Sequence, residues 1–331
     1  MHYVAYILDL DGVVYIGNDA VPHAIESLND AAANGIRLTA ATNNANRPAR
    51  DVAAHLVELG LRIDADDVVT SAQAAAEELA RILPEGAEVL AVGGPGVAWA
   101  LESVGLLPLR ADADLTIGDD VARRAEAVMM GYGPAVAWHD LAAAHWAIQR
   151  GVPWMATNTD STVPTKYGRA PGNGSLVRAL MHASGVEPMI AGKPQPALFE
   201  STMRTIGSRE VLVLGDRFDT DIDGAAACGI DSMLVLTGVH GLAELAEQPL
   251  ERWPSFVAQD LRSLSGPVAE LRIDGDAVAV FDDHPLVAAV AVAARARLGQ
   301  RLQVPAYVAQ PEAAPLVDLR PFLSAAGSVR A

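Results

Sequence analysis

The sequence predicts an α/β fold in which helices cover a parallel sheet. Short apolar runs of strand length alternate with helical patterns from the start of the chain, and several runs stop at turns that carry carboxylate, hydroxyl or amide side chains. Alternation of this kind favours a parallel sheet, because each crossover helix returns the chain to the same end of the sheet. In such folds the chemistry lies at the carboxyl ends of the strands.

The first sixty residues contain the elements that begin this sheet. An apolar run with β-branched and aromatic residues stops at an Asp-x-Asp-Gly turn beginning at Asp9, which is typical of a buried strand. A second apolar run leads into the polar turn Thr42-Asn43-Asn44, and the helix that follows ends at Gly60. The expected elements are strands at residues 4–8 and 36–41 and helices at residues 22–34 and 48–59.

The rest of the chain repeats this rhythm in three regions. Strands expected at 211–214 and 233–236 resume the first sheet. The stretch between the two groups has a rhythm of its own, with expected strands at 88–92, 127–130 and 154–156 and a helix at 139–150. After a change of composition near Leu264, we expect a hairpin of residues 268–273 and 277–281 across Asp274-Gly275, then a helix at 285–298.

These observations predict three parts of the chain. Residues 1–73 and 189–263 are assigned to a core domain, residues 74–188 to an inserted domain, and residues 264–331 to a C-terminal extension. The hairpin and single helix of the extension form too small a core alone, so we expect the extension to contact the core domain or a neighbouring subunit.

Charge and cysteine content exclude several classes of protein. The 331 residues carry 24 basic and 41 acidic side chains, and the net charge of −17 disfavours binding to nucleic acid or to an anionic membrane surface. Cys228 is the single cysteine, which excludes a disulfide framework within one chain. The first apolar run is interrupted by Asp9 and Asp11 and suits neither a signal peptide nor a membrane span. We expect a cytoplasmic protein, with a homo-oligomer left open.

Carboxylates that follow two of the expected strands are the first candidates for chemistry. Asp9 and Asp11 follow the first strand, with Gly12 allowing a tight turn, and Asp216 and Asp221 follow the strand at 211–214. Such a cluster needs a hard cation, and an all-oxygen donor set favours Mg²⁺. The alternative for Asp-x-Asp-Gly is simple turn chemistry. A calcium loop is excluded, because valines stand at 13 and 14 where that loop needs an oxygen ligand and a glycine.

Groups suited to phosphate occur at other turns. Thr42 offers a hydroxyl and Asn43 a backbone N–H at a strand end, while Lys193 offers a compact positive charge. A lone lysine is usually a solvated surface residue. Lys193, however, lies between Gly192 and Pro194, which predicts a stiffly placed side chain.

Together these motifs resemble those of the haloacid dehalogenase (HAD) superfamily of phosphatases, in its NagD-like or p-nitrophenylphosphatase-like branch with a type IIA cap. The superfamily motifs occur in order as DLDGVVYIG, ATNNA, GKPQP and GDRFDTDI, and the inserted region resembles the cap in AVGGPGVAWAL, MGYG, ATNTD and APGNGSLVRAL. The resemblance implies a Rossmann-like parallel-sheet core, an inserted α/β cap and a small C-terminal α+β extension. With the extension, the chain is similar to actinobacterial glycerol 3-phosphate phosphatases that carry an acetyltransferase-like remnant.

The resemblance also implies roles for the candidate residues. Asp9 would be the nucleophile and Asp11 the general acid and then base. Mg²⁺ would be held by Asp9, Asp216 and the backbone carbonyl of Asp11, with Asp221 orienting metal-bound waters. The transferring oxygens would be bound by Thr42, Asn43 and Lys193. Asn158 and Asp160 in the cap would select the substrate, or would only form turns.

The implied reaction is hydrolysis of a small phosphorylated metabolite, with glycerol 3-phosphate first and 2-phosphoglycolate, a sugar phosphate or an aryl phosphate next. A dehalogenase would need neither the acid at Asp11 nor the metal carboxylates, and this cap type goes with hydrolysis more than with phosphomutase chemistry. A non-catalytic binding protein on a HAD fold is the alternative of a different class.

Overall fold

The computed structural model describes residues 3–111, 120–165, 167–274, 277–280, 284–297 and 313–329. By its internal contacts the chain forms two compact units. Unit 1 consists of Met1–Ala40, Leu56–Ile63 and Ile206–Ala331, and unit 2 consists of Ala41–His55 and Asp64–Thr205. Three elements contain a boundary between the units, namely β4 (Arg37–Thr42), α2 (Ala49–Glu58) and α8 (Pro196–Ile206). The division into core, inserted domain and extension remains a prediction.

Unit 1 is built on a sheet whose central strands are parallel, which confirms the predicted fold class. The strands of this sheet that have residues in unit 1 follow the order β17-β16-β18-β15-β14-β13-β1-β4. All neighbours from β15 to β4 are parallel. The strands not yet defined are β1 (Ala5–Leu8), β13 (Val211–Gly215), β14 (Asp231–Val235), β15 (Phe256–Ala258), β16 (Val268–Asp274), β17 (Ala277–Val280) and β18 (Leu316–Asp318). Strand β1 lies between two parallel neighbours, and Ala5, Ile7 and Leu8 are fully buried, as the apolar run predicts.

The helices of unit 1 include both predicted and unpredicted segments. The predicted helix at 22–34 is confirmed as α1, and Gly60, with φ of 97°, follows the end of α2 as predicted. A π-helix between β13 and α9 was not predicted. The helical elements are α1 (Ala24–Ala33), the π-helix η2 (Phe218–Ile222), α9 (Asp223–Cys228), α10 (Leu242–Glu247), α11 (Pro285–Arg297), α12 (Arg320–Val329) and the 3₁₀-helices η3 (Leu250–Arg252) and η4 (Leu261–Leu264).

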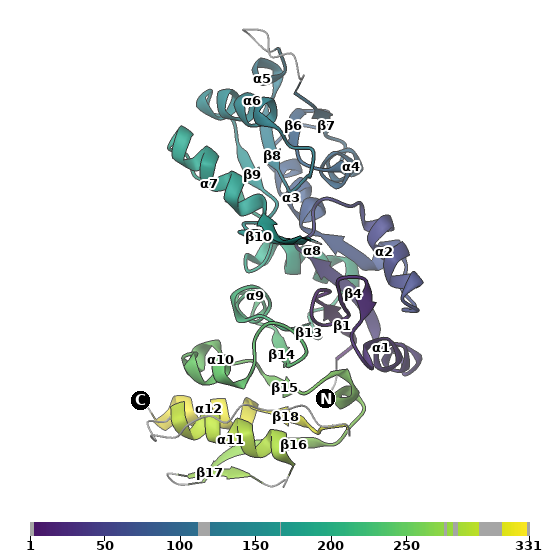
Figure 1. Cartoon of the computed structure of the whole chain (residues 1–331), viewed down its shortest axis with the longest axis vertical. Coiled ribbons are helices and arrows are strands. Elements are labelled where there is room, and N and C mark those ends of the chain that lie inside the picture. The colour runs from purple at the N-terminus through teal and green to yellow at the C-terminus, as the bar shows by residue number, and fades with distance from the viewer. Residues whose placement is uncertain are drawn as a thin grey trace. The chain divides into compact units, whose positions relative to one another are not determined.

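The C-terminal extension continues the sheet of unit 1. Strands β16 and β17 form the predicted antiparallel hairpin, and α11 is the predicted helix; Gly275, Phe281 and Leu298 lie outside the described residues. Strand β18 pairs antiparallel with β15 and parallel with β16. Helix α10 contacts α11, and α12 contacts β16 (Figure 1). The expected contact between the extension and the rest of the chain is therefore present within unit 1.

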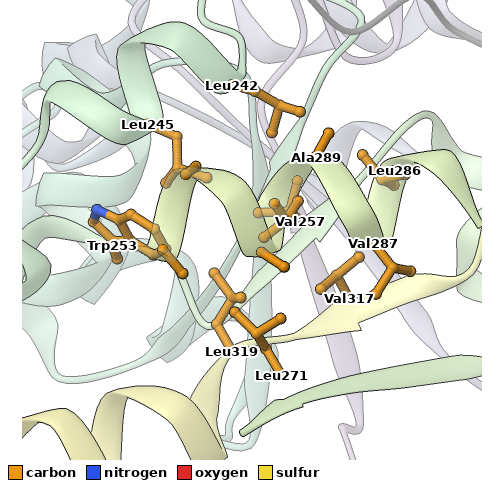
Figure 2. Packing of buried hydrophobic residues seen from close by; sticks show 14 of the residues in the cluster. Leu242, Leu245, Trp253, Val257, Leu271, Leu286, Val287, Ala289, Val317 and Leu319 are labelled. Carbon is orange, nitrogen blue, oxygen red and sulfur yellow. The ribbon is translucent and has the colours of Figure 1, made fainter. Parts of the chain in front are cut away.

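One hydrophobic cluster joins the extension to residues of the preceding strands and helices. Figure 2 shows Leu242 and Leu245 of α10 near Val257 of β15, together with Leu271 and Leu286 of the extension. The same cluster contains Phe218 and Ile222 of the π-helix. Because these side chains share one buried core, the extension stabilises unit 1 through apolar burial rather than folding around a core of its own.

Unit 2 contains a second parallel sheet, with strand order β12-β9-β8-β6-β7. The strands of this sheet are β6 (Glu88–Val92), β7 (Leu107–Leu109), β8 (Ala127–Met130), β9 (Trp154–Ala156) and β12 (Met189–Ile190). The residues of unit 2 also include β5 (Val68–Thr70), β10 (Thr162–Thr165) and β11 (Gly168–Pro171), which lie outside this sheet. The predicted strands at 88–92, 127–130 and 154–156 are confirmed with the same bounds, because each is a short and almost wholly buried apolar run.

The other elements of unit 2 are helical. They are the 3₁₀-helix η1 (Ala65–Asp67), α3 (Ser71–Ala80), α4 (Pro95–Ser103), α5 (Asp120–Arg124), α6 (Trp138–Gln149) and α7 (Asn173–Ser184). Helix α3 begins with a capping box in which Thr70 and Gln73 exchange hydrogen bonds, and α4 has Pro95 in its first turn. The predicted helix at 139–150 is confirmed as α6, one residue earlier.

Two short hairpins were missed by the sequence analysis. They are β10 with β11 in unit 2, and β2 (Tyr15–Ile16) with β3 (Asp19–Ala20) in unit 1. Their strands are two to four residues long and have no buried residue. A strand without a buried face has no apolar alternation to reveal it. Among the described residues, no helix is both long enough and apolar enough to cross a membrane.

Candidate active site

Three carboxylates meet at the carboxyl ends of β1 and β13. The two strands are parallel neighbours with Leu8 opposite Leu214, so the residues that follow them leave the sheet at the same edge. The Asp9 N–H continues the ladder by donating to the Leu214 carbonyl at 2.9 Å. One carboxylate oxygen each from Asp9, Asp216 and Asp221 lies within 4.8 Å of the others. The sequence analysis named all three residues.

Close packing around the carboxylates requires residues without side chains. A Cβ added at Gly238 would lie 1.9 Å from Asp216 Oδ2, and one added at Gly215 would lie 2.2 Å from Asp221 Cβ. Gly12 has a φ of 86°, and its Cβ position lies 2.4 Å from Asp216 Oδ2. The turn after β1 therefore needs glycine for its conformation and for its space.

Backbone N–H groups orient the two buried carboxylates. The Val239 N–H donates to Asp216 Oδ2 at 2.7 Å, and the Arg217 N–H donates to Asp221 Oδ2 at 3.2 Å. Asp216 is 1% exposed and Asp221 is fully buried. Three carboxylates at this spacing repel one another, and a bound cation offsets that electrostatic repulsion. Carboxylate oxygens are the ligands that Mg²⁺ prefers, so the donor set fits this ion.

Asp11 follows Asp9 at the start of the turn that leads into β2. Its side chain is exposed, whereas that of Asp9 is half-buried. Asp11 pairs with Tyr15 in an isolated bridge, and the Gly12 N–H donates to the Tyr15 carbonyl at 2.8 Å. The Asp11 backbone is thus held in a turn, and the residue is exposed.

The Arg217 side chain pairs with the neighbouring carboxylate of the π-helix. Its guanidinium donates to the two oxygens of Asp219 at 3.0 and 2.7 Å, and these hydrogen bonds lower the pKa of the Asp219 carboxyl below its usual value despite partial burial. In the same way, Arg252 donates to both oxygens of Asp223 at 2.8 and 2.6 Å. Asp219 and Asp223 are therefore engaged in ion pairs, whereas Asp221 is directed toward Asp9 and Asp216.

A second group of predicted residues lies in unit 2, centred on the side chain of Asn43. Its Oδ1 accepts the Lys193 N–H at 2.8 Å, and its Nδ2 donates to the Lys193 carbonyl and to Asp160 Oδ1, each at 3.3 Å. Thr42 ends β4, is 6% exposed and accepts the Asn44 N–H at 3.1 Å. The structure therefore brings Asn43 and Lys193 together, with Thr42 next to Asn43 in the chain.

Lys193 is 4% exposed, so it is not the solvated surface lysine of the alternative interpretation. Its peptide bond to Pro194 is cis. A Cβ at Gly192 would lie 2.5 Å from the Thr157 carbonyl oxygen and 2.7 Å from Asn43 Oδ1. The residue before Lys193 is thus held against the Asn43 side chain. The stiff placement of the Lys193 side chain itself remains a prediction.

The two predicted cap residues differ in how they are used. Asn158 is 3% exposed, and its Nδ2 donates to the Asn43 carbonyl at 2.7 Å while its Oδ1 accepts the Asp160 N–H at 3.2 Å. These bonds favour the interpretation of Asn158 as a turn-forming residue. Asp160 is half-buried and accepts from Asn43. Selection of the substrate by either residue remains a prediction.

Comparisons with known proteins agree with this arrangement. A family model for haloacid dehalogenase-like hydrolases matches residues 6–107, and a HAD-hydrolase-like model matches residues 190–264. The D-glycerol 3-phosphate phosphatase of Mycobacterium tuberculosis (strain ATCC 25618 / H37Rv) is 44% identical over 258 residues, which are 78% of this chain and 70% of that protein.

Two solved structures are similar to most of the chain. The crystal structure of a glycerol phosphate phosphatase from Mycobacterium tuberculosis in complex with magnesium has a TM-score of 0.77 at 39% identity, and the match covers 91% of this chain and 92% of that one. A p-nitrophenyl phosphatase from Archaeoglobus fulgidus has a TM-score of 0.71 at 27% identity, covering 80% of this chain and 98% of that one. The second protein is thus matched almost completely while a fifth of this chain lies outside the match.

Proposed function

The chain belongs to the haloacid dehalogenase-like hydrolases and is a phosphatase, and we propose that it releases phosphate from a small phosphorylated metabolite through an aspartyl phosphate on Asp9. The observation that carries this proposal is the meeting of Asp9, Asp216 and Asp221 at the carboxyl ends of β1 and β13. A non-catalytic protein on this fold would gain nothing from holding three carboxylates close together, because the carboxylates repel one another.

Asp9 and Asp11 divide the covalent and proton-transfer steps between them. A carboxylate oxygen of Asp9 attacks phosphorus, the bond from phosphorus to the leaving oxygen breaks, and Asp11 gives its proton to that oxygen. Asp11 then accepts a proton from water as the water oxygen attacks phosphorus, which releases phosphate and restores Asp9. The exposed side chain of Asp11 suits these two transfers because it can reach a group outside the cluster.

Mg²⁺ is the cofactor, since the cluster offers it an all-oxygen donor set and the similar glycerol phosphate phosphatase was crystallised with magnesium. In our proposal Asp9, Asp216 and the Asp11 carbonyl hold the ion, and Asp221 orients its waters. When bound, the ion supplies positive charge that offsets the carboxylates and the phosphoryl oxygens.

The group in unit 2 is proposed to bind the transferring phosphoryl group. Thr42 would donate its hydroxyl, Asn43 its backbone N–H and Lys193 its ammonium group. The Asn43 side chain accepts from the Lys193 N–H and donates to the Lys193 carbonyl, and these two bonds fix the point from which the lysine side chain extends. Asn158 and Asp160 are proposed to contribute to substrate selection through the loop that they shape.

Replacement of the nucleophile tests the covalent step. Asp9→Asn keeps the shape of the side chain but removes the attacking carboxylate, so kcat should fall by at least about 10³-fold. Asp19→Asn is the matched control, because Asp19 is an exposed aspartate of β3 outside the cluster. Initial rates with Mg²⁺ and p-nitrophenyl phosphate measure the effect. Activity of Asp9→Asn within tenfold of the unmodified chain would exclude Asp9 as the nucleophile.

Glycerol 3-phosphate is the proposed substrate. The relative that is 44% identical is a D-glycerol 3-phosphate phosphatase, and a magnesium-bound glycerol phosphate phosphatase matches 91% of this chain, a coverage that exceeds the 80% matched by the p-nitrophenyl phosphatase. The alternatives are 2-phosphoglycolate, sugar phosphates and aryl phosphates. Discrimination among them depends on differences in transition-state binding, which kcat/KM measures directly.

A panel of phosphate esters tests the substrate. We expect the highest kcat/KM for glycerol 3-phosphate, with 2-phosphoglycolate, hexose phosphates, p-nitrophenyl phosphate, nucleoside monophosphates and a phosphopeptide compared at one Mg²⁺ concentration. A preference of about 100-fold for a nucleotide or phosphopeptide, equivalent to about 2.7 kcal/mol in transition-state binding, would overturn the small-metabolite proposal. A comparable preference for another small ester would keep the class and change the substrate.

We also propose a cytoplasmic location, because a chain of 331 residues with one cysteine has the composition of a protein from a reducing compartment. Assembly into a homo-oligomer is a further proposal that size-exclusion chromatography with light scattering tests directly.

A further inference from the structure

The loop that follows β14 contacts the candidate metal site at several points. It consists of Thr237, Gly238, Val239 and His240 and is called the 237–240 loop here. None of its side chains belongs to the carboxylate cluster. Its backbone and side-chain groups nevertheless bind the turn after β1, the residue after β13 and the first residue of the π-helix η2, all of which belong to unit 1.

The loop holds Asp216 through two consecutive backbone groups. The Val239 N–H donates to the Asp216 carboxylate at 2.7 Å, and the His240 N–H donates to the Asp216 carbonyl at 3.1 Å. A Cβ at Gly238 would also lie 2.5 Å from Asp216 Cβ. Because one short stretch of backbone binds both the carboxylate and the carbonyl of Asp216, these contacts restrict rotation of the carboxylate.

The loop also fixes the turn that carries Asp9 and Asp11. The Thr237 hydroxyl donates to the Gly12 carbonyl at 2.6 Å. The Cβ position of Gly12 lies 3.1 Å from the Gly238 Cα, so the two backbones are in close contact. A shift of the loop would therefore move the turn and Asp216 together.

The imidazole of His240 affects the position of Asp221 indirectly, through Phe218. Its Nδ1 accepts the Phe218 N–H at 2.9 Å, and its ring lies 5.4 Å from the Phe218 ring at an interplanar angle of 33°. Phe218 is the first residue of η2, where backbone N–H groups have no partner within the helix. Asp221 lies three residues further along η2, so this acceptor fixes the start of the segment that presents Asp221.

We propose that His240 is a positioning residue for the metal site, with its imidazole acting as the acceptor that fixes η2 and thereby Asp221 relative to Asp216. The inference rests on the proposed Mg²⁺ site but not on the identity of the substrate. Under this inference, Mg²⁺ affinity depends on the acceptor atom of His240 rather than on the volume of its ring. Groups that orient metal ligands in this way typically change metal affinity about 10- to 100-fold when removed.

A pair of isosteric variants separates the acceptor from the volume. His240→Asn places an amide oxygen at the same number of bonds from Cβ as Nδ1, whereas His240→Leu has the same shape as asparagine without an acceptor. Calorimetric titration with Mg²⁺ alone, in the absence of substrate, gives the Kd of each full-length variant. We expect His240→Leu to weaken Mg²⁺ binding about tenfold or more and His240→Asn to remain within about threefold of the unmodified chain.

Thermal unfolding of both variants without Mg²⁺ separates positioning from a general loss of stability. Equal Mg²⁺ affinity for the leucine variant and the unmodified chain, or equal weakening in both variants, would overturn the inference. If the leucine variant does not fold, His240→Phe takes its place, since it keeps a ring of similar shape beside Phe218 but has no acceptor. That variant should weaken Mg²⁺ binding about tenfold or more, and an unchanged Kd would overturn the inference.

The same titration distinguishes failure of this inference from failure of the proposed function. If the unmodified chain binds Mg²⁺ and the leucine and asparagine variants differ as expected, but no phosphate ester is hydrolysed, the proposed reaction is wrong and the positioning role holds. If esters are hydrolysed and the two variants bind Mg²⁺ equally well, the positioning role is wrong and the reaction holds. Absence of Mg²⁺ binding by the unmodified chain would overturn both.

Discussion

The carboxylate cluster of unit 1 and the Asn43–Lys193 group of unit 2 are both built on turns that follow strands, but different groups hold them. In unit 1, backbone N–H groups of Arg217 and Val239 orient Asp221 and Asp216. In unit 2, one side-chain amide, that of Asn43, binds the N–H and the carbonyl of Lys193. The backbone dominates the first arrangement and a side chain dominates the second.

Charge explains the difference. A site made from three carboxylates cannot be oriented by charged side chains without competition for the oxygens that bind a metal ion, whereas neutral N–H groups stabilise negative charge and leave oxygens for the ion. A lysine side chain has only donors, so the part of the residue that can be fixed without neutralising the ammonium is its main chain, which has an N–H donor and a carbonyl acceptor. An amide side chain suits that purpose because it donates and accepts at once.

Because backbone groups orient the carboxylates, we expect the metal site to be most sensitive to substitution of the glycines that pack against them. Gly238→Ala would place a methyl group 1.9 Å from Asp216 Oδ2, so either the loop or the carboxylate must move. We expect Mg²⁺ affinity to fall by at least tenfold and kcat/KM at fixed Mg²⁺ by about 100-fold. Gly266→Ala is the matched control, because its Cβ would lie no closer than 3.6 Å to any atom. Calorimetry and initial rates measure both effects.

Unchanged Mg²⁺ affinity of the Gly238→Ala variant would contradict this account of how the carboxylates are held. Unchanged Mg²⁺ affinity in a folded Gly238→Ala variant would mean that Asp216 tolerates displacement, and that close packing by glycine is not what places the carboxylates. Circular dichroism establishes whether the variant is folded before either measurement is interpreted.

Substitution in the Asn43–Lys193 group should cause a smaller loss of activity than substitution of Gly238. It should lower kcat/KM without lowering Mg²⁺ affinity. Asn43→Ala removes the side chain that binds both backbone groups of Lys193, at a cost of about 1–3 kcal/mol if the partners remain buried. We expect kcat/KM to fall about tenfold with Mg²⁺ affinity unchanged. Asn44→Ala is the control, since Asn44 is the exposed neighbour in the same turn. A parallel loss of Mg²⁺ affinity in Asn43→Ala would contradict the separation of the two roles.

The sequence was sufficient to predict the residues of both groups, but not how they are held. Asp9 and Asp216 could be predicted as members of the carboxylate cluster because each follows a short apolar run. Lys193 could be predicted as a site residue because glycine and proline flank it. The donors that orient the carboxylates could not, since any residue other than proline at position 239 supplies the same backbone N–H. Asn158 illustrates the same limit, because turn asparagines that bind backbone and those that bind substrate have the same local pattern.

His240 was missed for a related reason. A lone histidine after a Thr-Gly turn carries no spacing that relates it to Phe218, which lies 22 positions earlier and approaches it only when β13 and β14 are paired. The extension shows the reverse case, because its hairpin and helix were predicted while the pairing of β18 with β15 was not. Pairing of distant strands depends on a register that local patterns do not contain.

The smallest expected effect on the metal site comes from the hydrophobic cluster of the extension. Leu286, which Figure 2 labels, is fully buried in the hydrophobic cluster. The same cluster also contains Phe218 and Ile222 of η2. Leu286→Ala removes buried apolar contacts and leaves a cavity, which should lower the free energy of unfolding by about 2–5 kcal/mol. Leu107→Ala, at a leucine that is 52% exposed, is the control and should change stability by less than about 0.5 kcal/mol.

Despite the shared cluster, Leu286→Ala should leave Mg²⁺ affinity and kcat within about twofold of the unmodified chain under conditions where the variant is folded. The reason is that the hydrogen bonds from the Phe218 N–H to His240 Nδ1 and from the Arg217 N–H to Asp221 Oδ2 fix η2 locally, and a cavity at Leu286 leaves them intact. Urea unfolding and Mg²⁺ titration of the same samples test this separation. A tenfold loss of Mg²⁺ affinity in the folded variant would show that packing against the extension, rather than the 237–240 loop, determines where Asp221 lies.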